Sequence, residues 1–152
     1  MGLHERLAAV GHVLPVPAAP VGAYVPAVRS GDLVFTSGQI SVRGGQVIAS
    51  GIVGEDISEE IARDCAVACV LNALAAASTV CDLDQVTRVV KLTGYVASAP
   101  GFTAQPRIID AASELIVDVF GESGRHAREA VGVAGLPLGV PVEISLVLEV
   151  DV

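Results

Sequence analysis

The sequence predicts an α+β domain in which two long helices pack on one face of a β-sheet. The 152 residues suit a single domain, and 52% of them are hydrophobic, which is enough to build a sizeable core. Hydrophobic periodicity gives the order β-β-β-α-β-α-β-β after an extended leader. Because two helices on one face leave the other face of the sheet bare, we expect another copy of the chain to cover it.

A leader is expected ahead of the domain. Residues 1–19 form this leader and residues 20–152 form the single domain. A short helix is expected within residues 3–10. Beyond it, Pro15 and Pro17 impose an extended chain, because proline has no backbone N–H to donate.

Three strands are expected at the start of the domain, separated by two chain reversals. The strands lie at residues 24–28, 33–40 and 46–49. The first reversal occupies residues 29–32, and the second is the pair Gly44-Gly45. Both contain residue types that favour tight turns, because these residues accept the backbone angles that turns require.

Two long helices are expected at residues 58–80 and 103–120. Ser58 can cap the first helix, and Pro106 fits the first turn of the second, where its missing N–H is harmless. Gly121 is a natural stop for the second helix. One face of each helix is predicted to be buried. These faces are Val67, Val70, Leu71 and Leu74 in the first helix, and Ile108, Ala112, Leu115 and Val119 in the second.

Three further strands are predicted from runs of β-branched residues, at 86–96, 126–133 and 142–150. The last strand alternates between apolar and mostly polar positions, a pattern typical of a strand with one buried face. Its apolar side consists of Val142, Ile144, Leu146, Leu148 and Val150.

The charge of the chain argues against nucleic acid and anionic membranes as partners. The 17 acidic residues outnumber the 9 basic ones, which gives a formal net charge of −8, and Lys91 is the single lysine. Nucleic-acid binders need clustered basic side chains to recruit phosphates, and the sequence shows no such cluster. No stretch is typical of a membrane span or a signal peptide, so we expect a cytoplasmic protein.

Cysteine and histidine form no recognisable site in the sequence. Cys65 and Cys69 lie four residues apart on a predicted helix, but the chain offers no second pair of metal ligands. We therefore interpret both as small buried residues. His126 lies near Arg128, and we interpret it as a solvated histidine at the end of a strand. No phosphate-binding loop, dinucleotide motif or nucleophile elbow is present.

Two charged residues, Arg128 and Glu143, stand near the starts of the last two strands, which a Leu-Pro turn joins. One interpretation is an ordinary ion pair across a hairpin. The other is a clamp for a substrate carboxylate beside an acid/base carboxyl, because the planar guanidinium of arginine binds a carboxylate through two hydrogen bonds. The spacing alone leaves both interpretations open.

Three motifs in the chain resemble the RidA/YjgF family. Residues 127–144 follow the pattern Ala-Arg-x4-Val-x2-Leu-Pro-x4-Val-Glu-Ile, which is similar to the C-terminal signature of that family. Residues 22–28 resemble its Gly-Pro-Tyr-x-x-Ala-Val motif, and residues 35–40 resemble its Ser-Gly-Gln strand. The resemblance covers about residues 20–150, and the longer leader is similar to a longer branch of the family.

The resemblance implies a chorismate-mutase-like fold assembled as a homotrimer, with clefts between neighbouring subunits. In such a cleft Arg128 would bind a substrate carboxylate, and Glu143 would position or activate water. Tyr24 would close the cleft, and Ser37 and Gly38 would line it. The implied reaction is hydrolysis of reactive 2-imino or 2-enamino acids to 2-keto acids and ammonia. The family requires no metal or organic cofactor for it.

Two positions depart from the pattern of active members. Active deaminases commonly carry Asn where Asp110 stands, so Asp110 places a negative charge near a carboxylate site. The position of Ala130 is often Cys, so any contribution from a thiol is absent here. Both residues are counted with the substrate-binding positions.

These departures keep other functions open. The same clefts would serve a non-catalytic trimer that binds or senses a small carboxylate such as a keto acid. The family is also labelled endoribonuclease L-PSP or translation inhibitor, which the net charge argues against. A purely structural oligomer with an inert pair of Arg128 and Glu143 is a further alternative.

Overall fold

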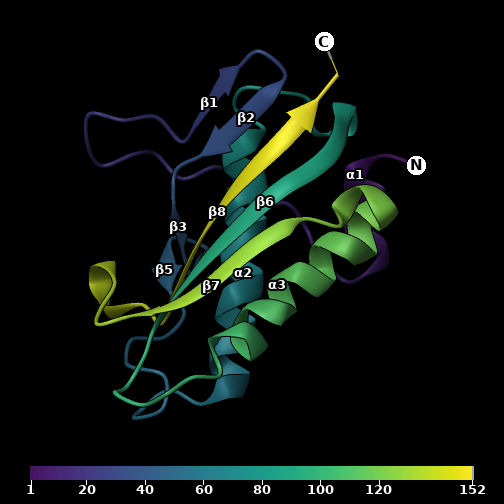
Figure 1. The fold of residues 1–152 in the computed structure, drawn as a ribbon. Helices are drawn as coiled ribbons and strands as arrows, with labels where there is room; N and C mark the ends of the chain where they lie inside the picture. The colour runs from purple at the N-terminus through teal and green to yellow at the C-terminus, as the bar shows by residue number, and fades with distance from the viewer. Residues whose placement is uncertain (152) are drawn as a thin grey trace.

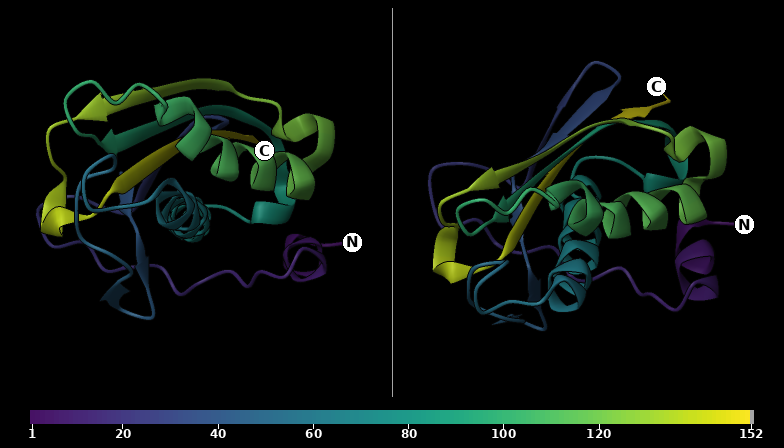
Figure 2. Two further views of the ribbon diagram at one scale, coloured as in Figure 1. Left: turned by 90° about the horizontal axis from the view of Figure 1, so that it is seen from below. Right: turned by 60° about the horizontal axis from the view of Figure 1, so that its bottom comes forward.

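A six-stranded sheet carries two long helices on one of its faces, as the sequence predicts (Figure 1). The computed structural model describes residues 1–151. Helices α2 (Glu59–Ala77) and α3 (Gln105–Phe120) both lie beneath the sheet in the left view of Figure 2. The predicted short helix, α1 (Leu3–Ala9), lies farther from the sheet, at one end of the molecule.

The spatial order of the strands differs from their order in the chain. The sheet consists of β1 (Ala27–Ser30), β2 (Leu33–Thr36), β3 (Gln39–Ile40), β6 (Val86–Ala97), β7 (Ala127–Val133) and β8 (Val142–Val150). Its order is β1-β2-β8-β6-β7, and β3 also pairs with β8. β6 runs parallel to β7 and antiparallel to β8. A separate hairpin is formed by β4 (Val42–Arg43) and β5 (Gln46–Val47).

The first predicted strand forms with shifted ends. It was expected at residues 24–28, but β1 begins at Ala27, because the preceding Pro26 has no N–H to donate to a sheet. The loop to β2 is shortened to Gly31 and Asp32. Gly31 has a φ of 61°, which suits the first position of a two-residue hairpin loop.

The strand predicted at residues 33–40 is divided into β2 and β3 at Ser37 and Gly38. Ser37 bonds back to the segment before β1. Its backbone N–H donates to the Pro26 carbonyl at 2.8 Å, and its hydroxyl donates to the Val25 carbonyl at 2.6 Å. Such local bonds from serine compete with the ladder of a sheet. The Ser-Gly pair therefore lies in a break between two strands.

The long helices begin and end close to the predicted positions. Ser58 caps α2 by accepting a hydrogen bond from the Ile61 N–H at 3.2 Å, and Pro106 lies in the first turn of α3. Gly121 follows α3 with a φ of 63°. α2 stops at Ala77, because the hydroxyls of the next residues bond back to its last carbonyls. Within residues 1–151, none of the helices is long and apolar enough to cross a membrane.

α2 is buried around most of its circumference, and not only along the predicted stripe. Cys65, Ala66, Cys69 and Ala73 are fully buried, whereas Val67 of the predicted stripe is half-buried. The sheet covers one side of the helix, α3 covers a second, and the leader crosses a third (Figure 2). A helix covered on several sides needs apolar residues all round.

The leader packs on the rest of the chain through α1. Leu3 and Leu7 are buried in the common core, and the Leu3 N–H donates to the Asp84 carboxylate at 2.6 Å. The Arg6 guanidinium lies 5.8 Å from the centre of the Phe120 ring, within the range of a cation–π contact. These contacts attach α1 to the segment before β6 and to the end of α3.

The face of the sheet opposite the helices carries exposed apolar side chains. Val28 is 51% exposed, Phe35 43% and Val131 44%, and the strand register places all three on this face. The helix-facing residues of β8, such as Ile144 and Leu146, are buried as the alternation predicts. An apolar face that remains open is the feature that the expected contact with another copy requires.

Candidate carboxylate-binding and acid/base site

Arg128 lies on β7 and points toward the helices. Its neighbour on the adjacent strand β6 is Leu92, which is fully buried against the helices, so both side chains lie on the helix side of the sheet. The Nη1 group of Arg128 donates to the Asp110 carboxylate at 2.7 Å and to the Ser113 hydroxyl at 3.2 Å, both on α3. The Arg128 side chain is 24% exposed, so the guanidinium is partly desolvated yet accessible to a ligand.

Glu143 lies on β8 and points toward the open face of the sheet. Its neighbour Ile144 is buried, so the alternation along the strand directs Glu143 to the other side, beside Tyr95 of β6. Gly38 approaches so closely that a Cβ at this position would collide with the Glu143 carboxylate. Tyr24 and Gly38 both line a small hollow next to β3.

Burial raises the pKa of Glu143 above its ordinary value, because desolvation disfavours the charged carboxylate. Two neighbours contribute to this environment. Gly38 lets the backbone approach the carboxylate, and Ser37 holds that backbone through its bonds to the segment before β1. A carboxyl group with a raised pKa exchanges its proton nearer to neutral pH, as general acid/base catalysis requires.

β6 lies between β7 and β8 (Figure 1) and so separates Arg128 from Glu143. The strand register and burial place the two side chains on opposite faces of the sheet. The interpretation as an ion pair across a hairpin is therefore wrong. Two strand spacings alone amount to about 10 Å. A small ligand can contact Arg128 and Glu143 together only if the two residues belong to different copies of the chain.

Asp110 faces Arg128 and neutralises it. A ligand carboxylate would therefore compete with Asp110 for the guanidinium of Arg128. Ala130 lies on the same side of β7 as Arg128, opposite Gly94, and packs against the core.

The structure thus brings the predicted site residues into two groups. One group contains Arg128, Asp110 and Ala130, and the other contains Tyr24, Ser37, Gly38 and Glu143.

Sequence reasoning missed Ser113 and gave His126 no role. His126 is half-buried: its Nε2 lies 2.9 Å from the Ser113 hydroxyl, and its Nδ1 lies 2.6 Å from the Gly124 carbonyl. The interpretation as a solvated histidine is wrong, because both ring nitrogens are bonded. A signal was available in the helical spacing of Asp110, Ser113 and Val117, which places them on one face of α3.

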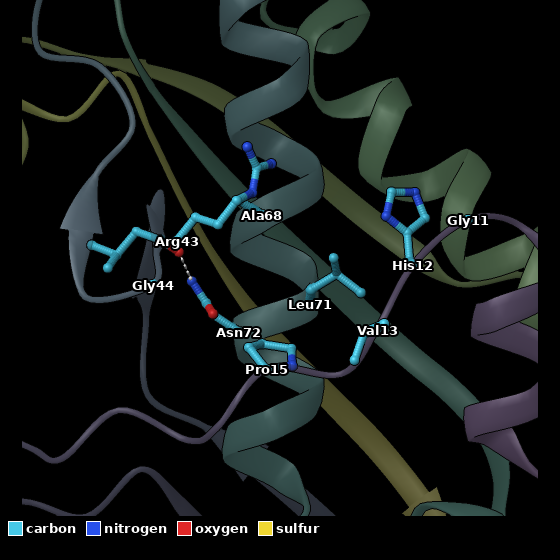
Figure 3. Close-up of a pocket in the computed structure, with 10 residues that line it drawn as sticks. Gly11, His12, Val13, Pro15, Arg43, Gly44, Ala68, Leu71 and Asn72 are labelled. Atoms are coloured by element: carbon cyan, nitrogen blue, oxygen red, sulfur yellow. Dashed lines mark hydrogen bonds between the residues drawn. The ribbon is translucent and has the colours of Figure 1, made fainter.

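A second hollow lies between the leader, α2 and β4 (Figure 3). His12 and Pro15 of the leader line it together with Leu71 and Asn72 of α2. The Asn72 side-chain amide donates to the Val42 carbonyl at 2.9 Å and so connects α2 to β4. The residues predicted for the site do not line this hollow.

The cysteines of α2 are part of the core. Cys65 and Cys69 are fully buried, and burial raises the pKa of both thiols. The Cys69 thiol donates to the Val142 carbonyl at 3.3 Å. In the part of the chain that the structure describes, His, Cys, Asp and Glu side chains form no group of three that could hold a metal ion.

The sequence matches known proteins over almost its full length. The model of a family described as Endoribonuclease L-PSP matches residues 16–150. Protein TCP17 of Trypanosoma cruzi is 45% identical over 96% of this chain and 92% of its own length. The chain therefore belongs to the endoribonuclease L-PSP family, which is the RidA/YjgF family that its motifs resemble.

Solved structures share the fold. A protein of unknown function from Agrobacterium tumefaciens is 43% identical, with a TM-score of 0.90 over 98% of this chain and 92% of that chain. The YjgF gene product of E. coli is 27% identical, with a TM-score of 0.64 over 88% of this chain and 92% of that chain. E. coli TdcF with bound serine is 24% identical, covers 92% of this chain and 97% of that chain, and has a TM-score of 0.65. This last likeness shows the fold alone.

Glu143→Gln should remove a pH-dependent cost to folding. Burial raises the pKa of Glu143 in the folded state above its value in the unfolded chain. The free energy of unfolding therefore falls as pH rises from the unfolded-state pKa through the folded-state pKa. The neutral amide avoids this fall. In urea unfolding at a series of pH values, the variant should equal the wild type in acid. Above that window it should be more stable, by up to about 1 kcal/mol after allowance for solvent screening.

The matched control is Glu149→Gln, which changes an exposed carboxylate of the same strand and should bring no such gain. Identical dependence of stability on pH in the wild type and in Glu143→Gln would show that the Glu143 carboxyl is not destabilised by burial.

Proposed function

We propose that this protein is a hydrolytic deaminase of the cytoplasm that converts reactive 2-imino and 2-enamino acids to 2-keto acids and ammonia. The observation that supports this function most is the half-buried Glu143 carboxyl with its raised pKa, held against Gly38 on an open face of the sheet. The reaction needs a proton donor and a positioned water, and one carboxyl group can serve both purposes. It needs no metal or organic cofactor.

We place the reaction in clefts between the subunits of a homotrimer. Since Arg128 and Glu143 face opposite sides of the sheet in one chain, a cleft with both needs Arg128 from one subunit and Glu143 from the next. A contact between two different surfaces repeats around a closed ring, and a ring of three gives three equal clefts. The apolar side chains of Val28, Phe35 and Val131 support a contact on the open face.

Arg128 and Glu143 divide the chemistry between them. Arg128 binds the substrate carboxylate and so fixes the imine carbon relative to Glu143. The protonated Glu143 carboxyl gives its proton to the imine nitrogen, and the resulting carboxylate accepts a proton from the attacking water. The water oxygen becomes the keto oxygen, its second proton passes to the nitrogen, and the nitrogen leaves as ammonia. An enamine first takes up a proton on carbon and loses one from nitrogen to become the imine. Tyr24 closes the cleft, which Ser37 and Gly38 line.

A second function, binding of a small carboxylate without turnover, is favoured by one specific observation. Asp110 already accepts a charge-assisted bond from Nη1 of Arg128 at 2.7 Å, so a ligand carboxylate competes with Asp110 for this guanidinium. Ala130 also supplies no thiol beside the clamp. Both features suit a site that binds a keto acid without turning it over.

Arg128→Ala should abolish binding of 2-ketobutyrate, whereas Glu143→Gln should keep binding and lose turnover. The reason is that loss of a charge-assisted, partly desolvated contact costs about 2–5 kcal/mol of binding free energy. Calorimetry measures the binding, and a coupled assay measures ammonia released from an imine generated in the reaction mixture. Arg88→Ala, which removes an exposed arginine of β6, should change neither quantity. Equal losses of stability with unaltered ligand affinity would contradict the assignment.

The protein should be a homotrimer in solution. Light scattering should give about three times the 15.4 kDa mass of the chain. Val131→Glu, which introduces charge on the open face, should reduce that mass and the ammonia release while leaving the circular dichroism of the helices intact. A monodisperse monomer of the wild type would rule out the cleft between subunits.

Asp110→Asn should preserve the fold and release Arg128 for the ligand. Calorimetry should then show about tenfold tighter binding of 2-ketobutyrate, equivalent to about 1.4 kcal/mol. Asp118→Asn, an exposed position on the same helix, is the control and should have no effect. Tighter binding without ammonia release from either protein favours the sensor, and unchanged affinity would mean that Asp110 does not compete with the ligand.

RNA should bind weakly in spite of the name of the family. The protein has a net charge of −8 and no basic cluster, so its side chains can displace few of the counterions bound to RNA phosphates. The Kd for single-stranded RNA should therefore exceed about 1 μM at physiological salt. Fluorescence polarisation with a labelled oligonucleotide measures this, and sub-micromolar affinity at that salt would instead support an endoribonuclease or translation inhibitor.

A further inference from the structure

A chain of hydrogen bonds ends on Arg128 and is not required by the chemistry proposed above. It begins at η2 (Gly121–Gly124), where the Gly124 carbonyl lies 2.6 Å from His126 Nδ1. His126 Nε2 lies 2.9 Å from Ser113 Oγ on α3. The same oxygen lies 3.2 Å from Nη1 of Arg128 on β7. Gly124 of η2, His126 of the segment before β7 and Ser113 of α3 therefore contribute to holding one guanidinium.

The donor and the acceptor at each step follow from the groups themselves. A carbonyl only accepts, so His126 Nδ1 carries a proton and donates it to Gly124. In the neutral ring Nε2 then accepts, so the Ser113 hydroxyl donates to it. Arg128 only donates, so the Ser113 oxygen accepts from Nη1. The Ser113 hydroxyl hydrogen is thereby directed to His126, which leaves its oxygen free to accept from Arg128.

We propose that Ser113 and His126 are positioning residues for Arg128 and that they couple carboxylate binding to protonation of His126. This inference rests on the proposed function, since it takes Arg128 as the group that binds the carboxylate. While His126 is neutral, Ser113 steadies the guanidinium beside Asp110. Once Nε2 carries a proton it donates to Ser113, and the Ser113 O–H is released to donate to a carboxylate bound at Arg128.

The charges around His126 make one added proton consequential. The depression that contains the ring is lined by Asp110, Ser113 and Val117 of α3, Arg125 before β7, and Arg128 of β7. Arg125 is paired with Glu122 at 3.1 Å. Arg128 is paired with Asp110 at 2.7 Å, so both ion pairs are balanced. Protonation of His126 turns this balanced region into a positive one, which favours an anion. Because such coupling is reciprocal, a bound carboxylate must favour the proton equally.

The test is proton uptake when 2-ketobutyrate binds. Calorimetry in two buffers of different ionisation enthalpy, between about pH 5.5 and pH 8, gives both Kd and the number of protons taken up. The wild type should take up a fraction of a proton and bind at least about fivefold more tightly at the acidic end. His126→Gln should lack this part of the uptake and this change in Kd. His4→Gln, which changes an exposed histidine of α1, should behave as the wild type.

Ser113 is tested by a pair of substitutions. Ser113→Ala removes the hydroxyl and should weaken binding about tenfold and raise KM, while kcat falls much less, because Glu143 is untouched. Ser113→Thr keeps a hydroxyl and should restore the affinity. An effect confined to stability, equal in both variants, would show that Ser113 only packs.

The outcomes separate this inference from the proposed function. Equal proton uptake and equal pH dependence in the wild type and in His126→Gln would overturn the coupling and leave Arg128 as the clamp. Absence of binding in the wild type would overturn the proposed function and the coupling with it. Nitrogen-15 NMR of the free protein tests the chain of bonds without a ligand: the neutral ring of His126 should carry its proton on Nδ1, and a proton on Nε2 would contradict the chain.

Discussion

The position of β6 between β7 and β8 determines where the two charged residues of the candidate site lie. β6 bonds to both strands, so Arg128 and Glu143 are two strands apart, and the register directs one to α3 and the other to the open face. The register of β8 is fixed by burial, because a slip of one residue would move Glu143 into the core and Ile144 to the surface. The packing that stabilises the fold therefore also sets the geometry of the site.

The two halves of the site hold their charges in opposite ways. Arg128 is compensated by Asp110 and held by Ser113, so its charge is stable but already engaged. Glu143 is desolvated, so its carboxyl retains a proton more readily than usual. The proposed substrate, with a carboxylate and an imine, would complement both conditions, since it would compete with Asp110 for the guanidinium and accept the proton of Glu143. Each half is chemically incomplete without the other.

Local features could be predicted because neighbouring residues determine them. Ser58 and Gly121 mark helix ends through hydrogen bonding and backbone angles, and the alternation of β8 gives the side toward which Glu143 points. The motifs pointed to candidate site residues but not to their separation, because the insertion of β6 depends on pairing between distant segments. The bond between Ser113 and His126 was not predicted for the same reason, because it joins α3 to the segment between η2 and β7.

In the proposed assembly, each site joins Arg128 of one subunit to Glu143 of the next. Mixing the inactive variants Arg128→Ala and Glu143→Gln, after shared refolding from urea, tests this directly. In a mixed ring one of the three interfaces brings an intact Arg128 to an intact Glu143, so an equimolar mixture should recover roughly a quarter of the wild-type ammonia release. Native mass spectrometry establishes that mixed trimers are present. No recovery of ammonia release in a sample that contains mixed trimers would contradict the account.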